Sequence, residues 1–179
     1  MNRNDVANYS VNEVLRDQRT IVIRAIRPDD KGLVVEALPH VSAESVYRRL
    51  FTMKKEMTAE ELKKATEVDF VNTVALVAVA LEKNGIEQLV GGGRYIRSGT
   101  TDAGQRAEVA FLIEDAFQGL GIASLIFKHL LTIARESGIA QFEAEVLPSN
   151  EAMLKVFTRS GLAIKKTATR ESVHVLMDL

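Results

Sequence analysis

The segment from Ala107 to Glu136 constrains the fold of this chain most. Residues 107–113 alternate in the manner of a strand, and residues 119–136 carry apolar side chains at the three-to-four spacing of a long helix. Between them, the run Gln-Gly-Leu-Gly-Ile-Ala-Ser at 118–124 places two glycines where the helix begins. The first amides of a helix have no intrahelical partner, and glycines leave them open to an anion. The segment therefore predicts a strand, an anion-binding turn and a helix, and favours a phosphorylated cofactor.

The remaining elements predict one mixed sheet. Residues 20–25 alternate as a strand, and the uninterrupted apolar run 73–81 indicates a buried strand. Residues 1–19 are polar and predict a loose tail or a short helix. The other expected elements are helices near 29–38, 42–51, 58–67 and 149–159, a turn at 83–85, a loop at 98–105, and strands near 87–97, 106–113, 141–146, 162–167 and 172–178. This order predicts an α/β fold with a mostly antiparallel sheet of about six to seven strands and helices on both faces.

Composition limits the functions to consider. The chain has 179 residues, 46% of them hydrophobic, and a formal net charge of −1. This size suits one domain, expected over residues 20–179, and the balanced charge argues against nucleic-acid binding. The sequence contains no cysteine, which removes disulfides, thiolate metal sites and cysteine nucleophiles. No apolar run has the length of a signal peptide core or a membrane span, so we expect a cytoplasmic protein that needs neither membrane nor metal.

Three phosphate-binding motifs compete for the glycines. A P-loop would need a lysine that this segment lacks, and the dinucleotide motif G-x-G-x-x-G would need glycine at Ser124. The pattern [RQ]-x-x-G-x-[GA] is satisfied by Gln118, Gly121 and Ala123. A second segment, Pro-Ser-Asn-Glu-Ala-Met-Leu-Lys-Val-Phe-Thr-Arg-Ser-Gly-Leu at 148–162, follows about 30 residues later. With these two segments, residues 20–179 resemble the GNAT superfamily of acetyl-CoA-dependent N-acetyltransferases.

The resemblance implies the GNAT fold, with a sheet splayed at the cofactor site, and acetyl-CoA as the cosubstrate. In this family the strand before the motif binds the pantetheine arm through its backbone, and the amides of the following turn bind the pyrophosphate. Asn150 lies at the start of the second segment's helix, where it could cap that helix, contact the cofactor, or do both. The cofactor-binding residues implied are Phe111, Leu112, Ile113, Gln118, Gly119, Leu120, Gly121, Ile122, Ala123, Ser124, Asn150 and Phe157.

Acetyl transfer to an amine needs a group that accepts the amine proton. The family uses direct attack in a ternary complex, so the lack of cysteine is no obstacle. Glu108, on the strand beside the expected cofactor, is the candidate base, and Glu143 and Glu145 on the next strand compete with it. The alternation of side chains places Glu108 on the face opposite Val109. The three histidines, His40, His129 and His174, are interpreted as structural or exposed.

Phe157 departs from the family pattern. Many members carry a tyrosine there that protonates the departing thiolate, and a phenyl ring cannot do so. Water could protonate the thiolate, or the thiolate could leave unassisted. A third alternative is that the protein is an acyl-CoA sensor without catalysis.

Further residues suggest the acceptor. The helix at 42–51 and the strand Ala-Glu-Val-Ala at 107–110 are similar to the catalytic domain of bacterial Pat-type protein lysine acetyltransferases. This resemblance implies a protein lysine as acceptor, often on an acyl-CoA synthetase. A small amine, such as a polyamine, an amino acid or an aminoglycoside, is the alternative. The sequence leaves open whether the protein is a monomer or a homodimer.

Overall fold

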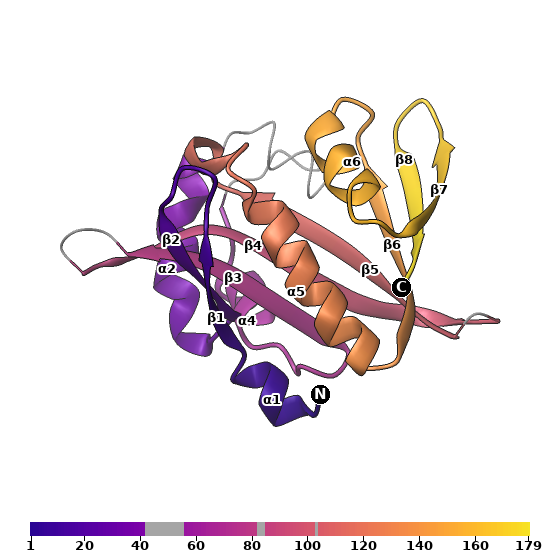
Figure 1. Ribbon diagram of the computed structural model, residues 1–179. Coiled ribbons are helices and arrows are strands. Elements are labelled where there is room, and N and C mark those ends of the chain that lie inside the picture. The colour runs from indigo at the N-terminus through magenta and orange to yellow at the C-terminus, as the bar shows by residue number, and fades with distance from the viewer. Residues whose placement is uncertain (42–55, 82–84, 103) are drawn as a thin grey trace.

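An eight-stranded sheet forms the centre of the molecule (Figure 1). The computed structural model describes residues 1–179 except 42–55, 82–84 and 103. The strand order is β1-β2-β3-β4-β5-β6-β8-β7, and among the strands of the described residues only β5 and β6 pair in parallel. The bounds are β1 Ser10–Val14, β2 Thr20–Ala25, β3 Thr73–Leu81, β4 Glu87–Thr101, β5 Gly104–Ile113, β6 Ile139–Val146, β7 Ala163–Ala168 and β8 Val173–Asp178.

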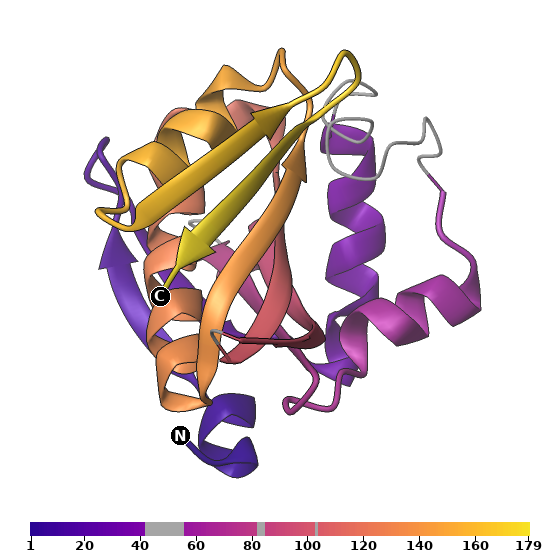
Figure 2. The same ribbon diagram turned by 90° about the vertical axis from the view of Figure 1, so that its right-hand side faces the viewer.

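Helices cover both faces of this sheet, as the sequence predicted. Helices α5 (Ile122–Glu136) and α6 (Glu151–Thr158) lie on one face, and α2 (Lys31–Ala37) and α4 (Ala59–Thr66) lie on the other (Figure 2). Helix α1 (Arg3–Ala7) lies near the C-terminal end of α5. Three short 3-10 helices complete the described elements: η1 Pro28–Asp30, η2 Leu38–His40 and η3 Asp115–Phe117.

The main core lies between the sheet and α5. Ile126, Leu130 and Ile133 of α5 are fully buried against apolar residues of β3, β4, β5 and β6. A smaller cluster, built on Ala75, Val77 and Val79, lies on the opposite face of β3. The apolar run 73–81 therefore supplies both faces, which explains why it does not alternate.

The N-terminal segment corrects one prediction. Residues 1–19 contain the short helix α1, but they are not otherwise a loose tail, because Ser10–Val14 forms the edge strand β1. It pairs antiparallel with β2, from Ser10 opposite Arg24 to Val14 opposite Thr20. This additional strand makes the sheet eight-stranded rather than six- to seven-stranded.

Other boundaries differ locally. The expected loop at 98–105 is mostly the end of the hairpin between β4 and β5, and α5 begins at Ile122 rather than at Gly119. The capping box predicted for α4 is present. The Thr58 hydroxyl accepts a hydrogen bond from the backbone amide of Glu61, and the Glu61 carboxylate accepts one from the backbone amide of Thr58. The predicted helix at 42–51 and most of the turn at 83–85 lie outside the described residues.

Gly91 and Gly93 of β4 permit a close approach to their neighbours. A Cβ atom at Gly93 would lie 2.7 Å from Ile126 of α5 and 2.7 Å from the ring of Phe111, and one at Gly91 would lie 2.7 Å from Ile113. The register between β3 and β4 also shifts between Ala78 and Val79, as a bulge does. The glycines therefore let α5 and the β5 side chains pack directly on β4.

Arg24 of β2 and Asp30 of η1 form a buried ion pair. Nη1 and Nη2 of Arg24 donate to the two carboxylate oxygens of Asp30 at 2.8 and 2.7 Å. The amide of Arg27 donates to the same carboxylate at 2.7 Å. Burial by itself raises the pKa of Asp30, but the hydrogen bonds from Arg24 and Arg27 outweigh it and hold the pKa below its usual 3.8. The pair fixes the chain as it leaves the sheet for α2.

A polar chain holds the N-terminal segment against α5. The hydroxyl of Tyr9 lies 2.6 Å from Nδ1 of His129, whose Nε2 lies 2.9 Å from the carboxylate of Glu13. Lys128 adds a contact to Glu13 at 3.2 Å. Burial lowers the pKa of His129 below its usual 6.5, although Glu13 opposes this effect. A neutral imidazole fits both contacts, because Nε2–H donates to the carboxylate while Nδ1 accepts from Tyr9.

This histidine makes stability depend on pH. Because the folded pKa lies below the unfolded value of 6.5, the unfolded chain binds the proton more readily, and the contribution of neutral His129 is lost as pH falls through 6.5 toward the folded pKa. We expect the melting temperature to fall between about pH 8 and about pH 5.5. His129→Gln should flatten this dependence, whereas His40→Gln, at an exposed histidine, should not. Equal slopes for wild type and His129→Gln in thermal melts would contradict this role.

Candidate functional site

Strands β5 and β6 separate halfway along their length. Their parallel pairing runs from Gln105 opposite Ile139 to Glu108 opposite Glu143 and then stops. Beyond this point, Val109–Ile113 pairs only with β4, while the remainder of β6 pairs with β8. One backbone edge of Val109–Ile113 therefore faces an opening in the sheet, which confirms the predicted splay.

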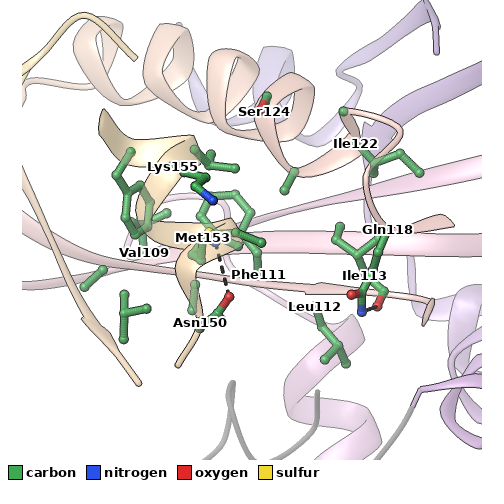
Figure 3. Close-up of a pocket in the computed structure, with 18 of the residues that line it drawn as sticks. Val109, Phe111, Leu112, Ile113, Gln118, Ile122, Ser124, Asn150, Met153 and Lys155 are labelled. Carbon is green, nitrogen blue, oxygen red and sulfur yellow. Dashed lines mark hydrogen bonds between the residues drawn. The ribbon is translucent and has the colours of Figure 1, made fainter. Parts of the chain in front are cut away.

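A cavity of about 480 Å³ occupies this opening (Figure 3). Its walls come from β5, the end of β6, the start of α5 and helix α6, with Arg16 from the turn between β1 and β2. The residues predicted from the sequence that line it are Glu108, Phe111, Leu112, Ile113, Gln118, Gly119, Gly121, Ile122, Ala123, Ser124, Asn150 and Phe157. Leu120 is the exception, because its side chain packs against the main core. Both faces of β5 contribute, so the cavity reaches from the α5 side of the sheet to the opposite side.

The start of α5 can bind an anion. The first backbone bond within the helix runs from the amide of Leu125 to the carbonyl of Gly121, so the amides of residues 122–124 have no helical acceptor. Gly119 and Gly121 have φ angles of +77° and +98°, which glycine adopts without strain. Gly121 is the N-cap and has no side chain that could occupy the amides. Gln118 lies beside the turn, and its Nε2 donates to the carbonyl of Ile113 and to Asp115 at 3.3 and 3.0 Å.

Helix α6 forms the opposite wall. The side chain of Asn150 accepts from the amide of Met153 at 3.2 Å, so the expected capping role is confirmed, and Asn150 also lines the cavity (Figure 3). Phe157 is almost completely buried and packs against Phe127 and Phe111, with ring centroids 5.3 and 6.1 Å away. The aromatic ring therefore contributes to the core as well as to the cavity wall.

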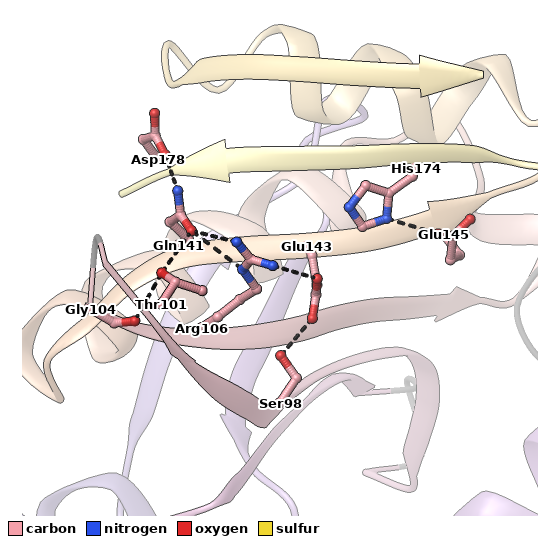
Figure 4. A network of polar contacts seen from close by, with 9 residues as sticks. All are labelled: Ser98, Thr101, Gly104, Arg106, Gln141, Glu143, Glu145, His174 and Asp178. Carbon is pink, nitrogen blue, oxygen red and sulfur yellow. Dashed lines mark hydrogen bonds and ion pairs between the residues drawn. The ribbon is translucent and has the colours of Figure 1, made fainter.

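The three candidate carboxylates lie in different surroundings. Glu143 accepts from the Ser98 hydroxyl and pairs with Arg106 at 3.5 Å, and Glu145 lies 2.8 Å from Nδ1 of His174 (Figure 4). Glu108 is exposed, lines the cavity and has no hydrogen bond or ion pair to another described residue. Glu145 also lines the cavity, whereas Glu143 does not. Of the three, Glu108 alone combines a place in the cavity with an unpaired carboxylate, within the described part of the chain.

The histidines lie outside the cavity, as expected for structural or exposed residues. His129 holds the N-terminal segment, His174 pairs with Glu145, and His40 lies 3.6 Å from the buried carboxylate of Glu114. Among the described residues, no group of three or more histidine, cysteine, aspartate or glutamate side chains could hold a metal ion. No helix in the same part of the chain is both long and apolar enough to cross a membrane.

Three basic residues in the cavity wall were missed by the sequence interpretation: Arg16, Lys155 and Arg159. Lys155 and Arg159 lie in or directly after α6, and their spacing of four residues was a usable signal. Arg16 lies in the turn between β1 and β2. No sequence pattern links it to the glycines, 103 residues away from it along the chain.

Comparisons with known proteins agree with this geometry. The profile of the acetyltransferase (GNAT) domain family matches residues 20–163. The chain belongs to the GNAT family. The crystal structure of the GNAT domain of S. lividans PAT is 38% identical, with a TM-score of 0.83, covering 95% of this chain and 97% of that one.

Two curated relatives carry acetyltransferase names. Acetyltransferase Pat of Mycolicibacterium smegmatis is 30% identical over 155 residues, covering 87% of this chain and 44% of the relative. Acetyltransferase PA5475 of Pseudomonas aeruginosa is 29% identical over 141 residues, which cover 79% of this chain and 74% of that relative. This GNAT chain thus spans less than half of the M. smegmatis protein. The predicted family, fold and enzyme class, an acyltransferase, are confirmed.

Proposed function

We propose that this GNAT domain transfers the acetyl group of acetyl-CoA to the side-chain amine of a protein lysine. The observation that carries the proposal is the opening between β5 and β6, where the start of α5 and the carboxylate of Glu108 line one cavity. Such a cavity can hold a phosphorylated thioester and a proton acceptor together.

The cofactor would lie along the free edge of β5. The backbone of Val109–Ile113 would bind the pantetheine arm as an added strand does, and the amides at the start of α5 would bind the pyrophosphate. Gly119 and Gly121 leave room for the phosphates to approach the backbone. The apolar wall of Phe111, Ile122 and Val156 would keep water from the thioester.

Glu108 would act as the base, directly or through one water. A lysine amine attacks the acetyl carbonyl only when it is neutral, and the attack releases a proton. The unpaired carboxylate of Glu108 can accept that proton, whereas Glu143 and Glu145 already have partners. The amine would attack the thioester directly, as the resemblance to the GNAT superfamily implies, so the lack of cysteine in this chain is no obstacle. Among the described residues that line the cavity there is no tyrosine, so water would protonate the thiolate or the thiolate would leave unassisted.

The acceptor is the least constrained part of the proposal. Two relatives are named Pat or PAT, and the sequence resembles the Pat-type lysine acetyltransferases. This likeness supports a lysine on a protein, with an acyl-CoA synthetase as the first candidate. A small amine would use the same chemistry at Glu108, so the choice between the two depends on the acceptor assay.

The assay measures thiol release from acetyl-CoA in the presence of different acceptors. We expect turnover with an acyl-CoA synthetase and with lysine-bearing peptides, and mass spectrometry should place the acetyl group on lysine. Matched peptides with arginine in place of lysine are the control. Turnover only with polyamines, amino acids or aminoglycosides would overturn the protein acceptor. Tight binding of acetyl-CoA without transfer to any amine would overturn catalysis and indicate a sensor.

A further inference from the structure

The turn between β1 and β2 contacts the glycine turn that precedes α5. Nη1 of Arg16 donates to the carbonyl of Gly119 at 3.0 Å, and the amide of Arg16 donates to the carbonyl of Leu120 at 3.3 Å. Arg19 of the same turn lies over the ring of Phe117, 4.5 Å from its centroid. Arg16 itself lines the cavity. Residues 1–19 lie outside the part of the chain that the family profile matches, yet they reach the cofactor site.

These contacts orient two peptide groups. In a planar trans peptide, the carbonyl and the N–H of the same unit point in opposite directions. Because the carbonyls of Gly119 and Leu120 are directed toward Arg16, the amides of Leu120 and Gly121 point away from it. Two carbonyl oxygens that would repel an anion are thereby turned aside, and two further donors are fixed in the turn.

Arg16 also supplies charge that the motif lacks here. The first position of [RQ]-x-x-G-x-[GA] is the neutral Gln118, and it lies next to the carboxylate of Asp115. The guanidinium of Arg16 has five N–H donors in a fixed plane, and its contact with Gly119 uses one of them. Lys155, at the other wall, is already paired with Glu151 at 3.1 Å. Of the three basic residues in the cavity wall, Arg16 is the one with hydrogen bonds to the glycine turn, whereas Lys155 and Arg159 lie in or directly after α6.

The turn that carries Arg16 is held firmly. Leu15 is buried in the main core, and its amide donates to the carbonyl of Arg19 at 2.8 Å. Strand β1 is fixed by its ladder with β2 and by the contacts of Tyr9 and Glu13 with His129. Arg16 is thus an exposed side chain on a rigid support, as a binding residue requires.

We infer that Arg16 completes the pyrophosphate site of the coenzyme, by orienting the amides of Leu120 and Gly121 and by adding the positive charge of its guanidinium to the cavity wall. This inference rests on the proposed use of acetyl-CoA. It makes the β1–β2 hairpin part of the cofactor site, although that hairpin is distant in sequence from both cofactor segments.

Calorimetry with three probes tests the inference. Acetyl-CoA carries the pyrophosphate and the 3′-phosphate, dephospho-CoA carries the pyrophosphate alone, and acetyl-pantetheine carries neither. We expect Arg16→Ala to lower the affinity for acetyl-CoA and for dephospho-CoA by about tenfold or more, which is the effect of losing a charged hydrogen-bond donor. Turnover with acetyl-pantetheine should keep its wild-type kcat/KM. Arg16→Lys should restore part of the affinity, because it keeps the charge but not the planar donor.

Controls separate this role from folding and from the proposed function. The substitution Arg170→Ala removes an exposed arginine from the β7–β8 turn. The resulting variant should bind all three probes with wild-type affinity. Wild-type affinity of Arg16→Ala for acetyl-CoA would overturn the inference. A loss of kcat/KM with acetyl-pantetheine as large as the loss of affinity for acetyl-CoA would also overturn it, because that would indicate a structural role. A loss confined to acetyl-CoA would assign Arg16 to the 3′-phosphate instead. If wild-type protein binds none of the probes, the proposed function itself fails.

Discussion

Glu108→Gln is expected to lower kcat for acetyl transfer by about 10²–10⁴-fold, the range that a positioned general base contributes. The change keeps the size of the side chain but removes its ability to accept a proton. Since Glu108 has no hydrogen bond or ion pair to another described residue, the substitution breaks no contact there. We therefore expect acetyl-CoA affinity and melting temperature to stay at wild-type values. Steady-state kinetics across a pH series, together with calorimetry, provide the measurement.

Glu143→Gln is the matched control for this prediction. Glu143 lies directly opposite Glu108 on the neighbouring strand, but it is paired with Arg106 and Ser98 and does not line the cavity. We expect the Glu143→Gln variant to transfer acetyl groups at close to the wild-type rate and to lose a modest amount of stability. If Glu108→Gln is as fast as wild type, or if Glu143→Gln is the slower of the two, the base has been assigned to the wrong carboxylate.

Asp30→Asn is expected to destabilise the fold by about 3 kcal/mol, the lower end of the cost of removing one partner of a buried ion pair, because the Glu87 carboxylate, 3.3 Å from Nη2 of Arg24, keeps part of the counter-charge. Both Arg24 and Asp30 are almost fully buried, and Asp30 accepts three hydrogen bonds from Arg24 and Arg27. An asparagine has one acceptor oxygen, and its NH₂ group would face a guanidinium that can only donate. The free energy of unfolding in urea measures the loss.

The neighbouring residue offers a control for Asp30. Asp29 belongs to the same short 3-10 helix but is exposed, so Asp29→Asn should change stability by less than about 0.5 kcal/mol, as typical surface substitutions do. Arg24→Ala should destabilise as Asp30→Asn does, and the double variant should lose less than the sum of the two, because the residues act as one pair. Additive losses would show that they act independently.

Local patterns identified much of this fold because they depend on near neighbours. The apolar, β-branched run of β3 indicates a buried strand, and the capping box of α4 lies within four residues. The glycines before α5 adopt positive φ angles at their own positions. The two cofactor segments then identified the family and the wall of the cavity. The side chain of Leu120 faces the core and does not line the cavity, so the predicted role of this residue in the site concerns its backbone amide in the turn.

The sequence by itself determined the order of the strands from β2 onward, the family and most of the residues of β5, α5 and α6 that line the cavity. Only the tertiary structure decided which carboxylate is unpaired, because the partners of Glu143 and Glu145 come from β4, β5 and β8. It also decided that residues 10–14 join the sheet and that Arg16 reaches the glycine turn. Such contacts join segments far apart along the chain, so no local periodicity or spacing records them, and only packing brings them together.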